Sequence, residues 1–160
     1  GSVSEIVDHV VKTVSQVGSS VRAIDYFGGW VAGMDSGGVS SSEDFGSWSI
    51  NLGGIIDVLS FGPSLVAERG IWVPSWRDGK SVIFLINPKG GSVDLEISHH
   101  SRIVSVFGGE EVICFGDDAG CVFVLEGDVL RRRFSMPLKE MEDGSRSSEL
   151  RRKIRGLRGG

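Results

Sequence analysis

Cysteine, proline and long apolar runs are all scarce in this sequence of 160 residues. No apolar run comes near the ~20 residues that a helix needs to cross a bilayer, so we predict no membrane-spanning segment. The N-terminus also lacks the basic and apolar regions of a secretory signal. We expect Cys114 and Cys121 to be small buried side chains without a disulfide, which favours an intracellular protein, cytoplasmic or nuclear.

Motifs for catalysis and cofactor binding are absent from the sequence. It has no Gly-x-Gly-x-x-Gly, no phosphate-binding loop, no Cys-x-x-Cys pair and no Gly-x-Ser-x-Gly elbow. His99 and His100 are neighbours at the end of an expected strand, so their side chains point to opposite faces and cannot bind one metal ion together. We expect both to be solvated turn residues. The sequence therefore predicts no enzyme, no cofactor and no metal site.

Glycine is abundant, with 24 residues against 4 prolines, and it separates short apolar runs. The pattern is clearest between Arg102 and Phe134, which contain Ile103–Phe107, Glu111–Phe115, Cys121–Leu125 and Val129–Phe134. Gly, Asp and Glu fill the short gaps between these runs, and Gly and Asp are typical of tight turns. This spacing predicts a meander of four antiparallel strands.

The same order of runs and turns recurs upstream. Val21–Gly29 is similar to Ile103–Gly109, and Val31–Val39 is similar to Ile113–Cys121. A looser middle copy contains Ile56–Gly62, Trp76–Val82 and Ser92–Ile97. Internal similarity at a period of tens of residues indicates a repeat architecture, here of about three repeats.

The repeat resembles a blade of a WD40-like β-propeller over roughly residues 21–137. Strand length, turn residues and their order carry the resemblance, whereas the Trp-Asp and Gly-His dipeptides of that family are absent. The resemblance implies antiparallel four-stranded blades. Because three blades do not close a ring, we expect open sheet edges that pair with another copy or with the missing part of a larger chain. The start at Gly1-Ser2, without methionine, also favours a cleaved or excised fragment.

Several segments add detail to this prediction. Ser4–Val17 has apolar residues at helical spacing but many β-branched residues, so we favour a helix and keep a strand as the alternative. We expect Gly37–Gly46 to be a polar loop in place of a third strand, followed by a strand over Trp48–Leu52. Ile71–Ile86 predicts a hairpin that is interrupted or at an edge at Pro74, with Ser81–Ile86 buried on both faces.

The C-terminal segment differs in charge from the rest of the chain. From Ser145 onward it contains six basic residues and one acidic residue, about +5, whereas the whole chain carries −4. Leu150, Ile154 and Leu157 share one helical stripe, which predicts a basic amphipathic helix. Such a helix either binds nucleic acid, an acidic protein or an anionic membrane, or docks on the chain's own acidic body.

These observations predict a mainly β protein. It has an N-terminal segment (1–20, helix or closing strand), a β-repeat body (21–137) and a linker with a basic tail (138–160). The alternative fold is a profilin- or roadblock-like α/β sandwich with Ser4–Val17 across the sheet. The predicted function is a non-catalytic scaffold or adaptor that binds a protein partner or itself. The alternatives are a nucleic-acid-binding accessory protein and a roadblock-like regulatory subunit of a GTPase or trafficking complex. The predicted partner-binding residues are Trp72, Trp76, Arg77, Leu150, Arg151, Arg152, Lys153, Ile154, Arg155, Leu157 and Arg158.

Overall fold

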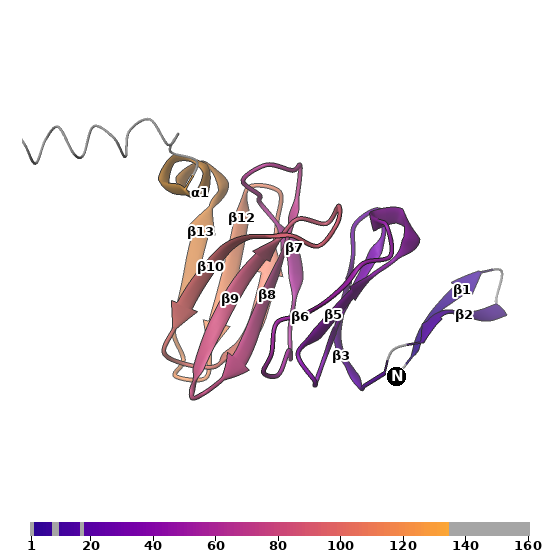
Figure 1. The fold of residues 1–160 in the computed structure, drawn as a ribbon. Helices are drawn as coiled ribbons and strands as arrows, with labels where there is room; N and C mark the ends of the chain where they lie inside the picture. Colours follow the sequence, from indigo (N-terminus) through magenta and orange to yellow (C-terminus); the bar gives the residue numbers. More distant parts are fainter. Residues whose placement is uncertain (1, 8–9, 17, 135–160) are drawn as a thin grey trace, which may run out of the picture.

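The computed structural model describes residues 2–7, 10–16 and 18–134 (Figure 1). Its strands are β1 (Ser2–Val7), β2 (Val10–Gln16), β3 (Val21–Tyr26), β4 (Trp30–Met34), β5 (Gly38–Ser41), β6 (Ser49–Asn51), β7 (Ser60–Gly62), β8 (Gly70–Arg77), β9 (Lys80–Ile86), β10 (Val93–His99), β11 (Ile103–Gly108), β12 (Val112–Asp117) and β13 (Val122–Glu126). The helices described are the 3-10 helix η1 (Glu43–Phe45) and α1 (Gly127–Phe134). The prediction of a mainly β protein is confirmed.

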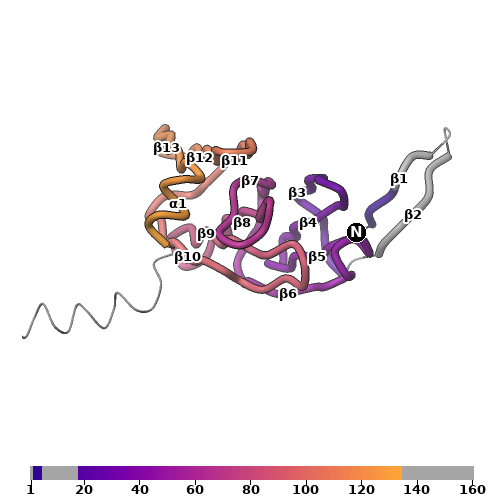
Figure 2. The backbone as a smooth tube through the Cα atoms, turned by 90° about the horizontal axis from the view of Figure 1, so that it is seen from above, coloured from indigo at the N-terminus to yellow at the C-terminus, as the bar shows by residue number. Residues whose placement is uncertain are grey.

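The described strands form four separate sheets, in the orders β1-β2, β3-β4-β5-β6, β7-β8-β9-β10 and β11-β12-β13. Every pairing is antiparallel and joins strands that follow one another in the chain. Figure 2 shows how the sheets are arranged: β3, β7 and β11 lie on one side, and the sheets fan out from there. In Figure 1 the β1-β2 hairpin lies at one end of the molecule and β13 toward the other.

Two apolar cores hold the neighbouring sheets together, one on each face of β7–β10. Alternate residues of a strand point to opposite faces, so β8 directs Ile71 and Val73 into the first core and Trp72 into the second. β9 alternates in the same way, and all its residues from Ser81 to Ile86 are buried. The prediction that Ser81–Ile86 is buried on both faces is therefore confirmed.

Pro74 lies within β8 rather than at a break in it. Its partner on β9 is Ile83, but on the other side β7 pairs only with residues 70–72. The next contact on that side is the single bridge between Ile55 and Trp76. Pro74 therefore lies where one side of β8 is locally an edge, and a residue without an N–H group is tolerated there.

The N-terminal helix prediction is wrong, and the strand alternative is right. Residues 2–7 and 10–16 form the β1-β2 hairpin. The many β-branched residues of this segment lose rotamer freedom in a helix and favour a strand. The α/β-sandwich alternative is wrong as well, because the described chain has separate sheets and no helix across one continuous sheet.

Two further elements differ from the prediction. Gly38–Ser41 forms β5, so the first repeat has a third strand where we expected a loop. Val129–Phe134 is part of α1 rather than a fourth strand. The helix is favoured because Leu130 is fully buried in the second core, while an Asp128–Arg132 ion pair spans one exposed turn. The predicted tail, from residue 138 onward, lies outside the described residues.

Candidate functional site

The predicted anchor Trp72 is not available to a partner. Its side chain is fully buried in the second core, where its indole N–H donates to the carbonyl of Pro63 at 2.9 Å. Its ring also meets Phe115 edge-on, with centroids 5.8 Å apart. This corrects the prediction: Trp72 joins the sheet β7-β8-β9-β10 to the sheet β11-β12-β13 and offers no surface to a partner.

Trp76 and Arg77 are half-buried at the end of β8 and make contacts within the chain. The Arg102 guanidinium lies over the Trp76 ring, 5.9 Å from its centroid. Arg77 donates to the carbonyl of Leu52 at 3.0 Å, and its ion pair with Glu96 is long, at 3.9 Å. The other predicted partner-binding residues, Leu150 to Arg158, lie outside the described residues.

An apolar surface that the sequence analysis missed lies on the sheet β11-β12-β13. In the register of this sheet, Phe107, Cys114 and Val124 form one cross-strand row, flanked by Val122 opposite Gly116 and by Val112 opposite Glu126. We call Phe107, Val112, Cys114, Val122 and Val124 the outer face, because the alternate residues of the same strands, such as Phe115, pack into the second core. Phe107 is 70% exposed, Val122 73% and Val124 56%.

One signal in the sequence could have revealed the outer face. Val122-Phe123-Val124-Leu125 is apolar at four consecutive positions, so both faces of β13 are apolar. Such a run is typical of a strand that is covered on both sides. In the described chain only one side of β13 is covered, by the second core, and β13 is the terminal strand of its sheet.

The opposite end of the fan has a smaller apolar surface on β3 and β4. Ile24 pairs with Ala32 and Tyr26 with Trp30 on the side away from the first core. Ile24 is 54% exposed and Tyr26 71%. We call Ile24, Tyr26 and Trp30 the far face. Both ends of the row of sheets therefore present exposed apolar side chains.

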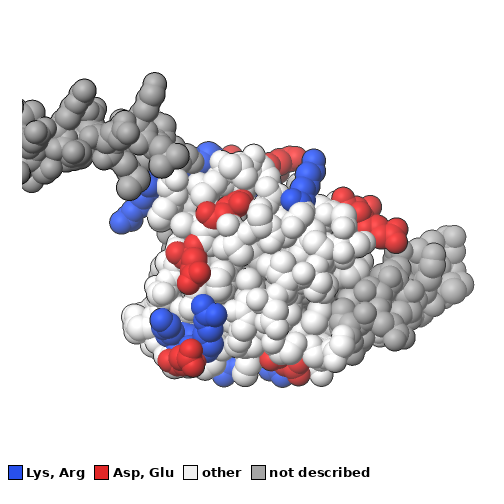
Figure 3. Space-filling view, viewed as in Figure 1, with Lys and Arg blue, Asp and Glu red and all other residues white. Residues whose placement is uncertain are grey.

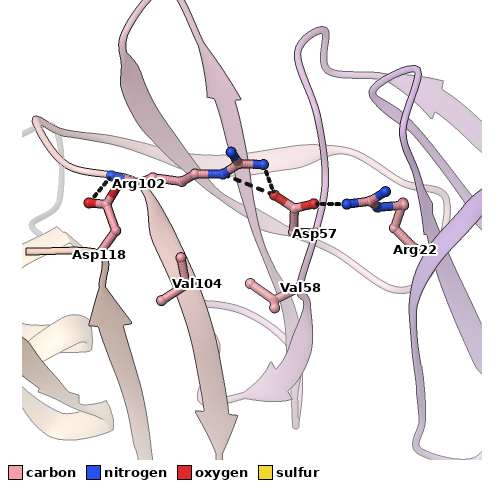
Figure 4. Close-up of a pocket in the computed structure, with 6 residues that line it drawn as sticks. All are labelled: Arg22, Asp57, Val58, Arg102, Val104 and Asp118. Carbon is pink, nitrogen blue, oxygen red and sulfur yellow. Dashed lines mark hydrogen bonds and ion pairs between the residues drawn. The ribbon is translucent and has the colours of Figure 1, made fainter. Parts of the chain in front are cut away.

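An open depression of about 620 Å³ lies where three sheets meet, beside Arg22, Asp57 and Arg102 (Figure 4). Arg22 donates to one carboxylate oxygen of Asp57 at 2.8 Å, and Arg102 donates to the other through two nitrogens, at 3.2 and 2.5 Å. Burial raises the pKa of Asp57, but the two guanidinium groups outweigh it and hold this pKa below its usual value. Both carboxylate oxygens of Asp57 accept hydrogen bonds from arginine. The three side chains therefore connect the sheets and have a structural role.

His99 is not the solvated turn residue that we expected. Its Nε2 lies 2.9 Å from Oδ2 of Asp117, whose side chain is fully buried. The other oxygen of Asp117 accepts from the backbone N–H groups of Ala119 and Cys121. The hydrogen bond from His99 and these backbone donors hold the pKa of Asp117 below its usual value. This pair fixes the β12–β13 turn against the end of β10.

Metal sites, membrane-spanning helices and charged patches are further features that could indicate a function in the described part of the chain. Within it, no group of three or more His, Cys, Asp and Glu side chains could hold a metal ion. No helix of the described residues is long and apolar enough to span a membrane. On the side of the molecule shown in Figure 3, basic and acidic side chains are interspersed and do not form a continuous basic patch.

The fold thus defines a mainly β protein built from separate antiparallel sheets. No protein-family model matches the chain, and no curated protein matches it. Among solved structures, the chain is similar to the crystal structure of a computationally designed protein, Ika4, with 12% sequence identity and a TM-score of 0.32. The match covers 71% of this chain and 94% of that one. Similarity at this level carries no conclusion about fold or function.

Proposed function

We propose that the protein is a non-catalytic assembly module that binds a macromolecular partner through the outer face. The observation that carries this proposal is the exposure of Phe107, Val122 and Val124 on one sheet face. Burying one side chain of this kind contributes about 1.5 to 3 kcal/mol, so covering all three favours association strongly.

The arrangement of the sheets supports a blade-like role for each repeat. Two successive repeats each form a four-stranded antiparallel meander, and the first strands β3, β7 and β11 lie on one side of the fan (Figure 2). We propose that these are blades of a propeller-like assembly, in line with the WD40-like resemblance. A row of blades that does not close exposes its end faces, and these are the apolar faces described above.

The nucleic-acid alternative is not favoured by a structural observation. It depends on Arg151–Arg158, which lie outside the described residues, and the face in Figure 3 has mixed charge. Phosphate binding needs a cluster of Lys and Arg side chains. An apolar sheet face fits a protein surface better than it fits a phosphate backbone.

Two substitutions on the outer face test the proposal. The variant Val122→Glu/Val124→Glu places two carboxylates on the outer face without touching either core. Val66→Glu is the matched control, because Val66 is as exposed as Val122, at 73%, but lies in the loop between β7 and β8. We expect light scattering at micromolar concentration to give more than the mass of one chain for the native protein and the control. The outer-face variant should have the 17.2 kDa of one chain.

A native protein that stays at 17.2 kDa, folded and soluble without a partner, would contradict the proposed function. So would an outer-face variant with the same mass as the control. Circular dichroism of all three proteins verifies that the fold is unchanged, which is expected because the substituted side chains are exposed.

A further inference from the structure

The β1-β2 hairpin has no partner strand within the described chain. β1 and β2 pair only with each other, and the sheet order gives them no neighbour. Figure 1 shows the hairpin standing away from the other sheets. An isolated two-stranded hairpin is only marginally stable in water, and a third strand or a packed face is needed to hold it. Val3 of β1 is buried, at 6% exposed, but neither β1 nor β2 has a third strand beside it, so an added strand would stabilise the hairpin.

The sheet β11-β12-β13 has an edge to which a strand could be added. The two repeats before it have four strands each, whereas it has three. After β13 the chain turns into α1, whose Leu130 is buried in the second core, instead of returning alongside β13. β13 is thus a terminal strand with an unpaired edge in the described part of the chain. An edge strand of this kind is a template for an added strand.

The hairpin and β13 lie at opposite ends of the molecule (Figure 1). One chain cannot bring them together without unfolding the row of sheets between them. Two copies related by a two-fold axis on the side of β3, β7 and β11 can do so, because each copy then presents its hairpin end to the other copy's β13 end. A two-fold arrangement makes this contact twice and closes the assembly.

The end faces favour the same arrangement. The outer face of one copy would meet the far face of the other, so that Phe107, Val122 and Val124 become covered together with Ile24 and Tyr26. All five of these side chains are exposed in one chain. Their joint burial leaves neither end of the row open.

We propose that a second copy of this chain is the partner, and that its β1-β2 hairpin adds to the free edge of β13 while the outer face packs on the far face. This inference rests on the proposed function and identifies its partner. Strand addition supplies backbone hydrogen bonds to both the hairpin and β13, and the apolar faces supply the burial.

A full-length hairpin variant tests the proposal. Neighbouring residues direct their N–H groups to opposite sides of a strand, so Lys12→Pro/Thr13→Pro removes one donor from each side of β2. The control Lys12→Thr/Thr13→Val changes the same positions but keeps both donors and the strand preference. We expect the proline variant to raise the dissociation constant of the dimer about 100-fold or more, and the control to dimerise like the native chain.

Mixing two monomeric variants is the decisive experiment. The proline variant keeps an intact outer face, and Val122→Glu/Val124→Glu keeps an intact hairpin. If the hairpin of one copy binds the other copy's β13 end, an equimolar mixture contains one intact contact and forms heterodimers, although each variant alone is monomeric. One variant is labelled with a fluorophore, and the molecular mass of the labelled species is measured. A heterodimer has twice the mass of one chain.

The outcomes separate the two proposals. The proline variant could dimerise like the native chain while the outer-face variant is monomeric. In that case the outer face mediates association without the hairpin, so the hairpin inference fails and the proposed function stands. If the two monomeric variants do not form a heterodimer, the hairpin inference also fails. If the native chain is monomeric, both the inference and the proposed function fail.

Discussion

At the scale of single residues, Asp57 connects three sheets through its ion pairs. No motif in the sequence indicated this connection. It lies just before β7, and its partners Arg22 and Arg102 lie at the beginning of β3 and just before β11. Three sheets therefore meet at one carboxylate. The side chain of Asp57 is 20% exposed, so its ion pairs are less screened than pairs on the open surface.

The substitution Asp57→Asn should destabilise the protein. The amide would keep the shape of the side chain but lose the charge that both guanidinium groups bind. We expect the free energy of unfolding to fall by about 1 to 2 kcal/mol. The control is Asp35→Asn, at an exposed carboxylate of the β4–β5 turn. Urea unfolding should give a lower midpoint for Asp57→Asn only, and equal midpoints for the two variants would contradict the structural role.

Acid should weaken the fold through the same carboxylates. The pKa values of Asp57 and Asp117 are both lower in the folded protein than the ordinary value of 3.8. A lowered pKa means that the folded state binds the proton less tightly than the unfolded state. The resulting stability is present above pH 3.8 and is lost as the pH falls through the lowered pKa values.

The pH dependence can be measured by urea unfolding between neutral and strongly acidic pH. The native protein should lose stability steeply below the ordinary pKa of aspartate. Asp57→Asn should lose less over the same range, because one of the two carboxylates is gone. A variant with the same acid dependence as the native protein would show that Asp57 does not contribute.

At the scale of elements, β7 and β11 approach each other closely at Gly108. A Cβ atom added at Gly108 would overlap the backbone carbonyl oxygen of Phe61. Backbone atoms cannot turn away as a flexible side chain can, so Gly108→Ala should cost about 3 kcal/mol or more. Gly18→Ala is the control, since nothing lies within 4 Å of a Cβ there. Thermal unfolding should separate the two variants clearly; a Gly108→Ala melting temperature near that of the control would contradict this packing.

The helix α1 contributes to the fold through one buried side chain. Leu130 is fully buried in the second core, and its truncation to Ala should cost about 2 to 5 kcal/mol. Arg133→Ala, on the exposed side of the same helix, should change the stability by a few tenths of a kcal/mol. Comparing the two variants by denaturant unfolding tests whether α1 is part of the core. Similar stability would mean that the helix does not pack on the sheets.

The sequence predicted the elements whose turns are clear and missed those that depend on tertiary contacts. Gly and Asp around residues 116–120 predicted the β12–β13 hairpin, and the apolar run at residues 81–86 predicted the central strand β9. In contrast, Val129–Phe134 has strand-like composition, and only the burial of Leu130 favours the helix. The β1-β2 segment has both periodicities, so its sequence could not decide between helix and strand.

At the scale of the whole molecule, the sequence predicted open sheet edges but did not predict the exposed apolar outer face. The number of repeats was enough to expect a row of sheets that does not close. Locating the outer face requires the register of β11, β12 and β13, because that register decides which side of each strand is covered. Trp72 has the residue type of a good partner anchor, but the side of β8 on which it lies is covered. It is therefore a core residue.

Hydrogen–deuterium exchange of β13 tests whether the hairpin of one copy pairs with β13 of another. In a monomer, the outward N–H groups of Val122–Glu126 lack a partner strand within the described chain and should exchange rapidly. We expect slow exchange along β13 in the native protein and fast exchange in Lys12→Pro/Thr13→Pro, with β9 protected in both. Equal exchange of β13 in the two proteins would contradict it.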